Sequence, residues 1–173
     1  MELTLLRHAP LPAMYHGRYI GHTDIMIDDT LFERDKIEHL LNQTFDRIYS
    51  SDLVRCTATL EIMGMKPFTT DSRLREVRFK PSIEGKSFFQ IEAMDDFTLE
   101  ALDSKENWHQ LICEESSLMF QSRIENFLQD LPGESKVLIC THGGTIGMIL
   151  ALITPDYSDI PLGYLEYITV SLG

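Results

Sequence analysis

Short apolar runs alternate with amphipathic stretches along most of this chain. The apolar runs predict five strands, at residues 3–6, 47–50, 68–70, 136–141 and 164–172. The stretches between them predict four helices, at residues 29–44, 53–63, 117–131 and 145–153. Because strands alternate with helices, the sequence predicts an α/β domain with a mostly parallel sheet.

Residues that favour helix ends support two of these helices. Ser51-Asp52 is expected to cap the helix at 53–63, and Gly64 to end it. Ser116 or Ser117 is expected to cap the helix that follows. The sequence shows no repeat or linker, and 173 residues suit one domain. We therefore expect a single domain over residues 1–173.

The stretch at 77–113 is irregular and acidic, with weak helical periodicity. We expect it to form a lid or specificity wall beside a binding site. Its aromatic side chains are candidates for stacking on an aromatic leaving group; they are Phe79, Phe88, Phe89 and Trp108. The alternative, that they anchor the core, is the more common role of such side chains.

The charge and hydropathy of the chain exclude two classes of partner. The formal net charge is -12, with no run of Lys or Arg to offset it, so we expect no nucleic-acid partner. No stretch approaches the roughly 18 apolar residues that span a bilayer, so we expect no membrane contact. A small anionic ligand is not excluded, because a few local arginines can dominate the electrostatic potential of one pocket.

The three cysteines, Cys56, Cys113 and Cys140, are far apart in the sequence. An odd number of separated cysteines is typical of a reduced, cytoplasmic protein with free thiols. No Cys-x-x-Cys or His-x-x-x-His spacing indicates zinc, so we expect no metal. The sequence leaves the oligomeric state open between a monomer and a homodimer.

Polar residues follow three of the predicted strands. Arg7 and His8 follow the first strand, Arg55 lies just after the second, and His142 follows the strand at 136–141. Ligands of open α/β sheets bind outside the carboxyl ends of the strands. We therefore expect two histidines and two arginines to converge on one crevice.

Taken alone, each of these residues has a plainer explanation. A histidine at a strand end is more often a hydrogen-bonded structural residue, and Arg55 could extend to solvent. Together they suit phosphate chemistry, because guanidinium groups match phosphate oxygens with paired donors. Two arginines would also keep a neighbouring histidine neutral and nucleophilic. The turn at Gly143-Gly144 would direct helix N–H groups at the same anion, although it could also be only a tight turn.

Cleavage of a phosphate ester also needs an acid for the leaving oxygen. Glu76, in the segment Leu74-Arg75-Glu76, is the candidate. A carboxyl beside a phosphate dianion tends to hold its proton, which suits a general acid. By residue type alone, a solvated surface glutamate is the more common explanation.

Four motifs together resemble the histidine phosphatase superfamily, also called the phosphoglycerate mutase-like family. They are LLRHA at 5–9, SSDLVRC at 50–56, LREVRF at 74–79 with EGKSFFQIE at 84–92, and VLICTHGGTI at 137–146. They occur in the order typical of the family and cover most of the chain. The resemblance implies a three-layer α/β/α fold with a mostly parallel central sheet.

The resemblance also implies roles for individual residues. His8 would carry a transient phosphoryl group, which Arg7, Arg55 and His142 would hold. Glu76 would protonate the leaving group and then activate water. No metal or cofactor is implied, and the expected partner is a small phosphorylated substrate.

The favoured activity is that of a phosphomonoesterase, because the chain is short for a cofactor-dependent mutase. A mutase that uses the same residues and a non-catalytic phosphate-binding protein stay open as alternatives. Two departures from the family pattern are compatible with the non-catalytic alternative. Ala9 replaces the usual Gly, and Lys80 to Ile83 stand where Gly-x-Trp is frequent.

A finer resemblance lies in the segment GRYIGHTDI at 17–25. It is similar to a segment of the α-ribazole phosphatase branch, which implies α-ribazole phosphate as a candidate substrate. Arg18 in this segment is a further candidate for contacting phosphate. The alternative is that it is a solvent-facing loop residue.

Overall fold

A computed structural model describes residues 1–133, 135–154 and 161–172 of the chain. Its centre is a five-stranded sheet of order β3-β2-β4-β1-β5. The strands are β1 (Glu2–Arg7), β2 (Arg47–Ser50), β3 (Thr69–Thr70), β4 (Lys136–Thr141) and β5 (Tyr167–Ser171). All neighbouring strands are parallel except β5, which runs antiparallel to β1. The predicted α/β fold with a mostly parallel sheet is confirmed.

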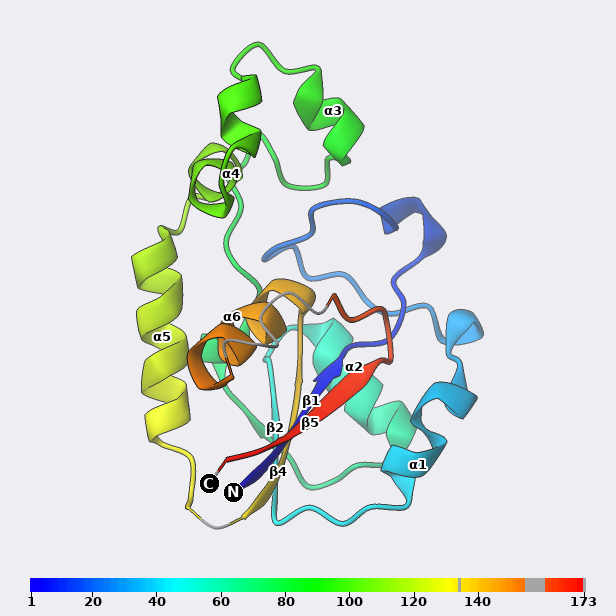
Figure 1. Ribbon diagram of the computed structural model, residues 1–173. Helices are drawn as coiled ribbons and strands as arrows, with labels where there is room; N and C mark the ends of the chain where they lie inside the picture. The colour runs from blue at the N-terminus through cyan, green and yellow to red at the C-terminus, as the bar shows by residue number, and fades with distance from the viewer. Residues whose placement is uncertain (134, 155–160, 173) are drawn as a thin grey trace.

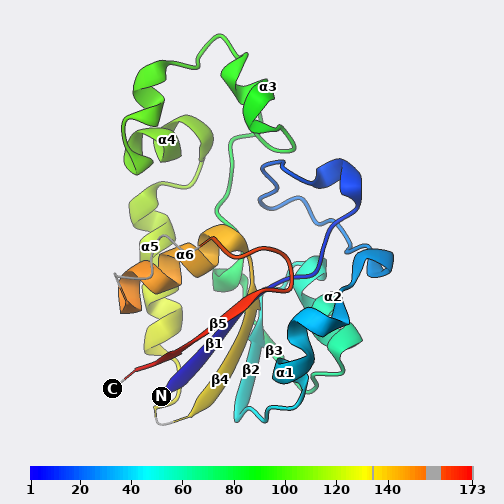
Figure 2. The ribbon, with the colours of Figure 1, turned by 45° about the vertical axis from the view of Figure 1, so that its right-hand side comes forward.

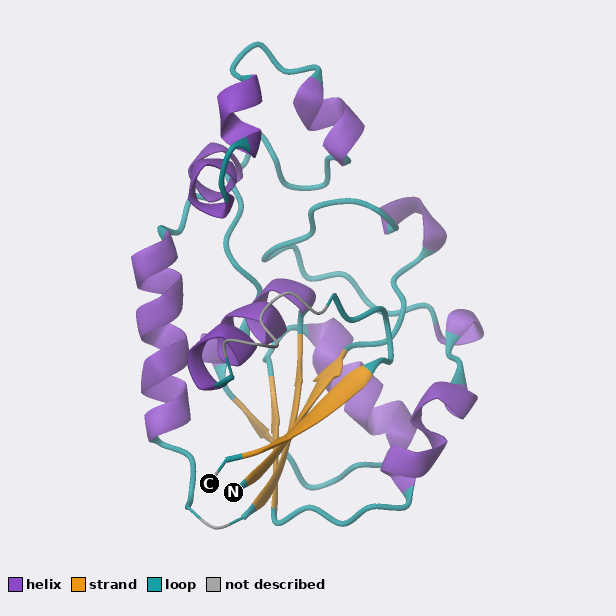
Figure 3. Ribbon diagram, in the orientation of Figure 1, coloured by secondary structure: helices purple, strands orange, loops and turns teal. Residues whose placement is uncertain are grey.

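Helices cover both faces of this sheet, as Figures 1 and 3 show. Helices α5 (Ser117–Gln129) and α6 (Gly143–Ile153) lie on one face, and α1 (Glu38–Leu41) and α2 (Val54–Met63) on the other (Figures 1 and 2). Ser116 caps α5 by accepting a hydrogen bond from the N–H of Met119, as predicted. In the part of the chain described above, no helix is long and apolar enough to cross a membrane.

The alternation of side chains along the central strands produces one core on each face. Val137 and Ile139 of β4 belong to the core beneath α5 and α6, whereas Leu138 and Cys140 belong to the core beneath α1 and α2. Successive side chains of a strand point to opposite faces, so a strand that is buried on both sides is apolar throughout. This explains why β1 and β4 appear in the sequence as mostly apolar runs, with the buried Thr4 of β1 hydrogen-bonded to Thr169.

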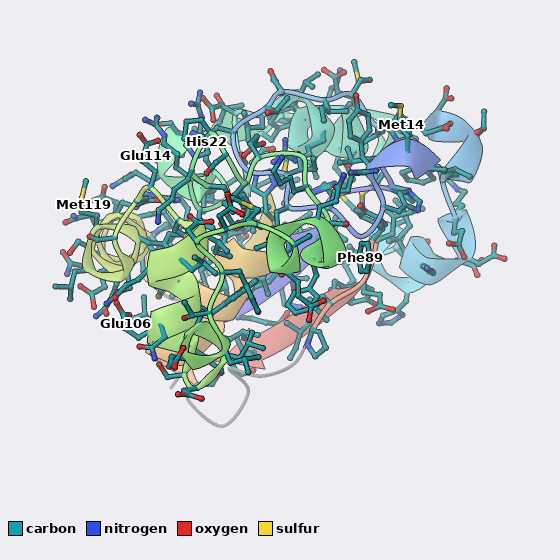
Figure 4. All side chains as sticks on the ribbon, turned by 90° about the horizontal axis from the view of Figure 1, so that it is seen from above. Met14, His22, Phe89, Glu106, Glu114 and Met119 are labelled. Atoms are coloured by element: carbon teal, nitrogen blue, oxygen red, sulfur yellow. The ribbon has the colours of Figure 1, made fainter. Side chains whose placement is uncertain are left out.

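Residues 77–113 run over the carboxyl ends of the strands. They contain α3 (Phe88–Glu92), a 3-10 helix (Leu99–Leu102) and α4 (Lys105–Ile112). Figure 1 shows these helices at the top of the molecule, and the view from above in Figure 4 shows α3 with Phe89 and α4 with Glu106 in front of the sheet. This segment is therefore placed to border any ligand bound at that edge.

The predicted continuous helix at 29–44 is wrong. The structure has two short 3-10 helices, Asp29–Leu31 and Arg34–Ile37, followed by the four-residue α1. The backbone is extended at Phe32 and Glu33, which separates the pieces. Burial of Ile37 and Leu40 fixes this segment without a continuous amphipathic face, so tertiary contacts override the helical pattern.

The predicted cap of α2 is also wrong. The N-cap residue is Leu53, which provides no side-chain hydrogen bond. The backbone N–H of Val54 instead donates to the carboxylate of Asp24, at 2.7 Å. A helix start satisfied from a distant loop leaves no local capping signal in the sequence. It also fastens the loop around residue 24 to the beginning of α2.

The last strand is shorter than predicted, because β5 begins at Tyr167 and not at residue 164. Tyr164 and Leu165 form a turn in which Leu165 has a φ of 59°. That value lies in the left-handed region, which a leucine rarely adopts. The turn places Tyr164 beside the end of β1.

Candidate active site

A cavity of about 380 Å³ opens at the carboxyl ends of β1 and β4. Every candidate site residue from the sequence lines it: Arg7, His8, Arg18, Arg55, Glu76, His142 and Gly143. These residues come from separate parts of the chain, and the parallel strands bring them together. The convergence expected from the strand ends is therefore present.

His8 is buried and its ring is oriented by the backbone beside it. The Nδ1 atom lies 2.8 Å from the carbonyl oxygen of Ala9. Since a carbonyl can only accept, Nδ1 carries the proton and Nε2 keeps its lone pair when the ring is neutral. Burial, followed by the positive charges of Arg55 and Arg7, holds the pKa of His8 well below its usual value. The lowered pKa favours the neutral ring, in which Nε2 carries the lone pair.

His142, the residue after β4, has the opposite tautomer. Its Nδ1 accepts a hydrogen bond of 3.1 Å from Nε of Arg55. Its Nε2 lies 2.9 Å from the hydroxyl of Ser51, to which it donates. Burial and the charge of Arg55 hold the pKa of His142 well below its usual value. The two histidine rings meet edge to face, with their centroids 5.3 Å apart.

Arg55 lies in the first turn of α2 and is only 1% exposed. Its Nη2 donates to the carbonyl of Gly21 at 2.6 Å, and its Nη1 to the carbonyl of Thr23 at 2.9 Å. A Cβ at Gly21 would come within 2.8 Å of the Val77 carbonyl, so this close approach of the loop requires glycine. The alternative of a solvent-directed Arg55 is excluded, and each Nη still has a second N–H for a ligand.

Arg7, the last residue of β1, faces an aromatic ring and has an unused donor. Its guanidinium lies over the ring of Tyr164, 4.5 Å from the centroid, and Nη1 donates to the carbonyl of Leu162 at 2.6 Å. Among the buried polar side-chain atoms that the structure describes, Nε of Arg7 alone lacks a partner. An unmet buried donor costs roughly 1–3 kcal/mol, which an anionic ligand would recover.

Glu76 lies in the cavity with its carboxylate at the start of α6. One oxygen accepts from the N–H of Gly144 at 2.9 Å and the other from the N–H of Val77 at 3.0 Å. A Cβ at Gly144 would come within 2.5 Å of the carboxylate, so glycine is required there. The Gly143-Gly144 turn therefore directs the Gly144 N–H at Glu76, and the solvated-surface alternative for Glu76 is excluded.

A partly buried arginine that sequence reasoning missed holds the backbone of this segment. Arg123, on α5, donates to the carbonyls of Arg73, Arg75 and Glu76 and pairs with Glu115 at 2.6 Å. Its place on a helix gave no signal, because a charged residue there is ordinarily solvated. Arg123 thus fixes the position from which Glu76 enters the cavity.

Aromatic residues from two loops and from helix α4 form one wall of the cavity. Tyr19 meets Phe79 edge to face at 5.5 Å and Trp108 at 6.0 Å, and all three line the cavity while packing on the core. Phe79 and Trp108 therefore pack on the core, as the alternative expects, and also border the cavity, whereas stacking on an aromatic leaving group stays a prediction. Phe88 touches Trp108, whereas Phe89 is 78% exposed. Neither Phe88 nor Phe89 lines the cavity.

Arg18 borders the same cavity from an exposed loop. Its guanidinium donates to the carbonyls of Met14 and Gly85 and to the side chain of Gln90. These bonds fix the arginine against the segment at 77–113. A phosphate contact by Arg18 stays a prediction.

Both departures from the family pattern are accommodated. Ala9 is fully buried, and its N–H donates to the hydroxyl of Thr59 at 2.8 Å. The N–H of Lys80 donates to the carbonyl of Ile112, and Ile83 packs into the core. Neither change removes a polar group from the cavity.

The cysteines are buried free thiols, and Cys113 lines the cavity. Burial raises the pKa of Cys113 to about 12, so this thiol is not a nucleophile at neutral pH. Within the described residues, no three His, Cys, Asp or Glu side chains are grouped as metal ligands.

Two buried histidines, two arginines and a carboxylate thus line one cavity. The family model of the histidine phosphatase superfamily (branch 1) matches residues 3–170. The chain belongs to this superfamily. A comparison with curated proteins finds no match.

Solved structures with the same fold support this assignment. The protein TTHB049 from Thermus thermophilus is 28% identical, with a TM-score of 0.73 over 99% of this chain and 94% of that one. The α-ribazole phosphatase from Shigella flexneri is 22% identical, with a TM-score of 0.79 over 100% and 91%. A phosphoserine phosphatase from Entamoeba histolytica is 23% identical, with a TM-score of 0.75 over 97% and 89%. The last two show the shared fold.

Proposed function

We propose that this chain is a phosphomonoesterase that acts through a phosphohistidine intermediate on His8. The observation that carries the proposal is the bond between Nδ1 of His8 and the Ala9 carbonyl, which leaves Nε2 free in the cavity. The lowered pKa keeps this nitrogen unprotonated at neutral pH. A neutral imidazole needs no separate base to attack phosphorus.

The substrate's phosphoryl group would lie among Arg7, Arg55 and His142. The arginines supply charged donors to its oxygens, and the geometry of a guanidinium matches two of them at once. His142 has its Nδ1 bonded to Arg55 and its Nε2 bonded to Ser51, so the ring is already oriented, and a phosphoryl oxygen would accept the Nε2 proton in place of Ser51. Gly143 leaves room beside Arg7, since a Cβ there would meet its Cζ at 3.6 Å. Positioning and charge neutralisation are the main sources of catalysis in phosphoryl transfer.

In the first step Nε2 of His8 forms a bond to phosphorus as the ester P–O bond breaks. The electron pair of that bond goes to the leaving oxygen, which takes a proton from the protonated carboxyl of Glu76. The products are the alcohol, phosphohistidine and the Glu76 carboxylate.

In the second step the Glu76 carboxylate accepts a proton from water, and the water oxygen bonds to phosphorus. The P–N bond breaks, its electron pair returns to Nε2, and inorganic phosphate leaves. Glu76 is protonated again, so acid and base roles alternate on one residue.

The substrate we propose is a small phosphorylated metabolite, with α-ribazole phosphate as the first candidate. Its support is the segment 17–25, which contributes Tyr19 and Ile20 to the cavity wall. We propose that residues 77–113 act as the lid or specificity segment, because Phe79 and Trp108 border the leaving-group side. An aromatic leaving group would have rings to contact there.

The test is hydrolysis of para-nitrophenyl phosphate by the wild type and by His8→Ala, with exposed His39→Ala as the matched control. We expect His8→Ala to lose at least about 100-fold in kcat, given the size of nucleophilic contributions. Wild-type turnover in His8→Ala would exclude the mechanism. Protein quenched with denaturant at alkaline pH, where the P–N bond is stable, should contain phosphohistidine after mixing with substrate, and its absence would favour a non-catalytic binding protein.

A screen over α-ribazole phosphate, sugar phosphates, phosphoglycerates and a phosphopeptide then identifies the leaving group. Release of free phosphate from a phosphoglycerate supports the phosphatase. Formation of the isomeric phosphoglycerate would instead identify a mutase.

A further inference from the structure

Tyr164 contacts the residues that the proposed mechanism depends on. Its ring centroid lies 4.5 Å from Cζ of Arg7 and 5.5 Å from the ring centroid of His8. On its other side the ring lies 5.3 Å from that of His16. Sequence patterns did not single out this tyrosine, because they assign its position to the beginning of a strand.

The backbone that carries Tyr164 is fastened to β1. The N–H of Leu165 donates to the carbonyl of Arg7 at 3.2 Å and to that of His8 at 3.4 Å, and the N–H of Arg7 donates to the carbonyl of Glu166. Leu165 is fully buried and holds a φ of 59°, a conformation that costs a leucine about 1–2 kcal/mol. Such strain persists only where the surroundings fix it. The position of Tyr164 relative to Arg7 and His8 is therefore built into the fold.

The ring of Tyr164 restricts where the Arg7 guanidinium can lie. A cation is attracted to the face of an aromatic ring, and the distance of 4.5 Å is within the range of this interaction. Together with the bond from Nη1 to the Leu162 carbonyl, the ring sets both the plane and the direction of the guanidinium. The remaining N–H groups of Arg7 are then left for a phosphate.

Tyr164 also separates two cavities. One is the active-site cavity, and the other is a neighbouring cavity of about 400 Å³ bordered by His16, Phe32 and Lys36. Tyr164 is the residue that these two cavities share in their linings. Loss of the ring would join them and would admit water to the side of His8 that now faces an aromatic surface.

We propose that Tyr164 is a positioning residue, which holds Arg7 for phosphate binding and closes the active-site cavity beside His8. The proposal rests on the proposed function, since it assigns Tyr164 a part in the same site. It assigns the ring, and not the hydroxyl, as the active part of the side chain. Tyr164→Phe removes only the hydroxyl, whereas Tyr164→Leu removes the ring, so the two variants separate the contributions of the two parts.

Several ionisable groups share the surroundings of His8 and bear on any pH experiment. Arg7 lies on β1, Arg55 on α2, His142 after β4 and Glu76 across the cavity. His16 lies behind the Tyr164 ring. Since Tyr164→Leu removes none of these groups, a change in His8 titration would report the lost ring and the water that replaces it.

The experiment compares wild type, Tyr164→Phe, Tyr164→Leu and the control Phe32→Leu. Phe32 lines the neighbouring cavity and packs on the core beneath α1 and α2, but it does not line the active-site cavity. We measure kcat/KM for para-nitrophenyl phosphate, the Kd for inorganic phosphate by calorimetry, and the His8 titration by NMR. We expect Tyr164→Phe and Phe32→Leu to stay within about twofold of wild type. Tyr164→Leu should weaken phosphate binding and kcat/KM by about tenfold, from the size of a desolvated cation–π contact.

In Tyr164→Leu the pKa of His8 should also rise toward its usual value, because burial is the main cause of its lowering. Wild-type phosphate affinity together with an unchanged His8 titration in Tyr164→Leu would overturn the proposal. If Tyr164→Leu does not fold, Tyr164→Met takes its place, because methionine fills irregular space well.

The phosphate and NMR measurements need no turnover. They therefore decide the role of Tyr164 even if the wild type hydrolyses nothing, an outcome that would count against the proposed function alone. If wild type and Tyr164→Leu hydrolyse the ester equally and bind phosphate equally, the proposed role of Tyr164 is wrong, and the proposed function is unaffected.

Discussion

The Nε of Arg55 donates a hydrogen bond of 3.1 Å to Nδ1 of His142. This bond gives His142 a single neutral tautomer, whose Nε2 proton is directed to Ser51. It also turns the guanidinium so that its two Nη atoms meet the carbonyls of Gly21 and Thr23. A single arginine thus joins α2, the loop at 21–23 and the end of β4.

Arg55→Lys should therefore be far from conservative. Lysine keeps the charge but cannot bond His142, Gly21 and Thr23 from one planar group. We expect kcat/KM for para-nitrophenyl phosphate to fall by about 100-fold, the usual cost of removing one oriented donor from a charged transition state. Arg47→Lys, at an exposed position, is the matched control and should leave kcat/KM unchanged. Activity within about threefold of wild type would show that charge alone suffices at position 55.

Gly144→Ala should displace Glu76. The added Cβ would lie within 2.5 Å of the carboxylate, which must then move and lose its bond to the residue 144 N–H. We expect kcat to fall by about 100-fold, at the lower end of a general acid–base contribution. Gly147→Ala in the same helix meets nothing within 4 Å and serves as control. A drop of equal size in both variants would point to a general effect on α6.

The two buried histidines should make stability depend on pH. Each has a folded-state pKa well below its ordinary value, so between the two values the unfolded chain binds a proton that the native chain does not. Stability is then full above about pH 6.5 and decreases as the pH falls below it, by about 1.4 kcal/mol per pH unit for each histidine. Urea unfolding at about pH 7.5, 6.5 and 5.5, on both sides of the ordinary histidine pKa, measures this slope. His8→Gln should reduce the dependence of stability on pH, and His39→Gln, at an exposed position, should leave it unchanged.

Arg123→Gln should affect both stability and activity. It breaks a largely buried ion pair with Glu115 and removes donors to three carbonyls, including that of Glu76. We expect a loss of about 2 kcal/mol in the free energy of unfolding, below the full cost of a buried pair because the pair is partly hydrated. The exposed Arg34→Gln should change neither quantity. If folded Arg123→Gln keeps the wild-type kcat, then Arg123 contributes to stability alone.

The sequence predicted the sheet and the polar set around His8 because both depend on local patterns. Continuous apolar runs mark strands buried on two faces, and parallel strands bring their carboxyl ends to one edge. Arg7, His8, Arg55 and His142 all follow directly from this rule. Glu76 lies on no strand, so its choice depended on the need for an acid and was strengthened by the family resemblance.

What the sequence missed depends on contacts between distant segments. The Asp24 carboxylate caps α2 from another loop, and Arg123 reaches the Glu76 segment from α5. Tyr164 was assigned to a strand because its neighbours alternate, whereas the positive φ of Leu165 turns the chain there. Propensity and periodicity report on neighbours in the sequence and carry no information about such contacts.

The pairing of β1 with β4 and β5 has a consequence for synthesis on the ribosome. His8 is made before both strands that pair with β1, because β4 and β5 follow it in the sequence at Lys136–Thr141 and Tyr167–Ser171. A nascent chain that lacks residues 136–171 has an unpaired apolar β1 and no His142. We therefore expect the proposed phosphate-ester cleavage to appear only after residues 136–171 have been made, and β1 to stay exposed to chaperones until then.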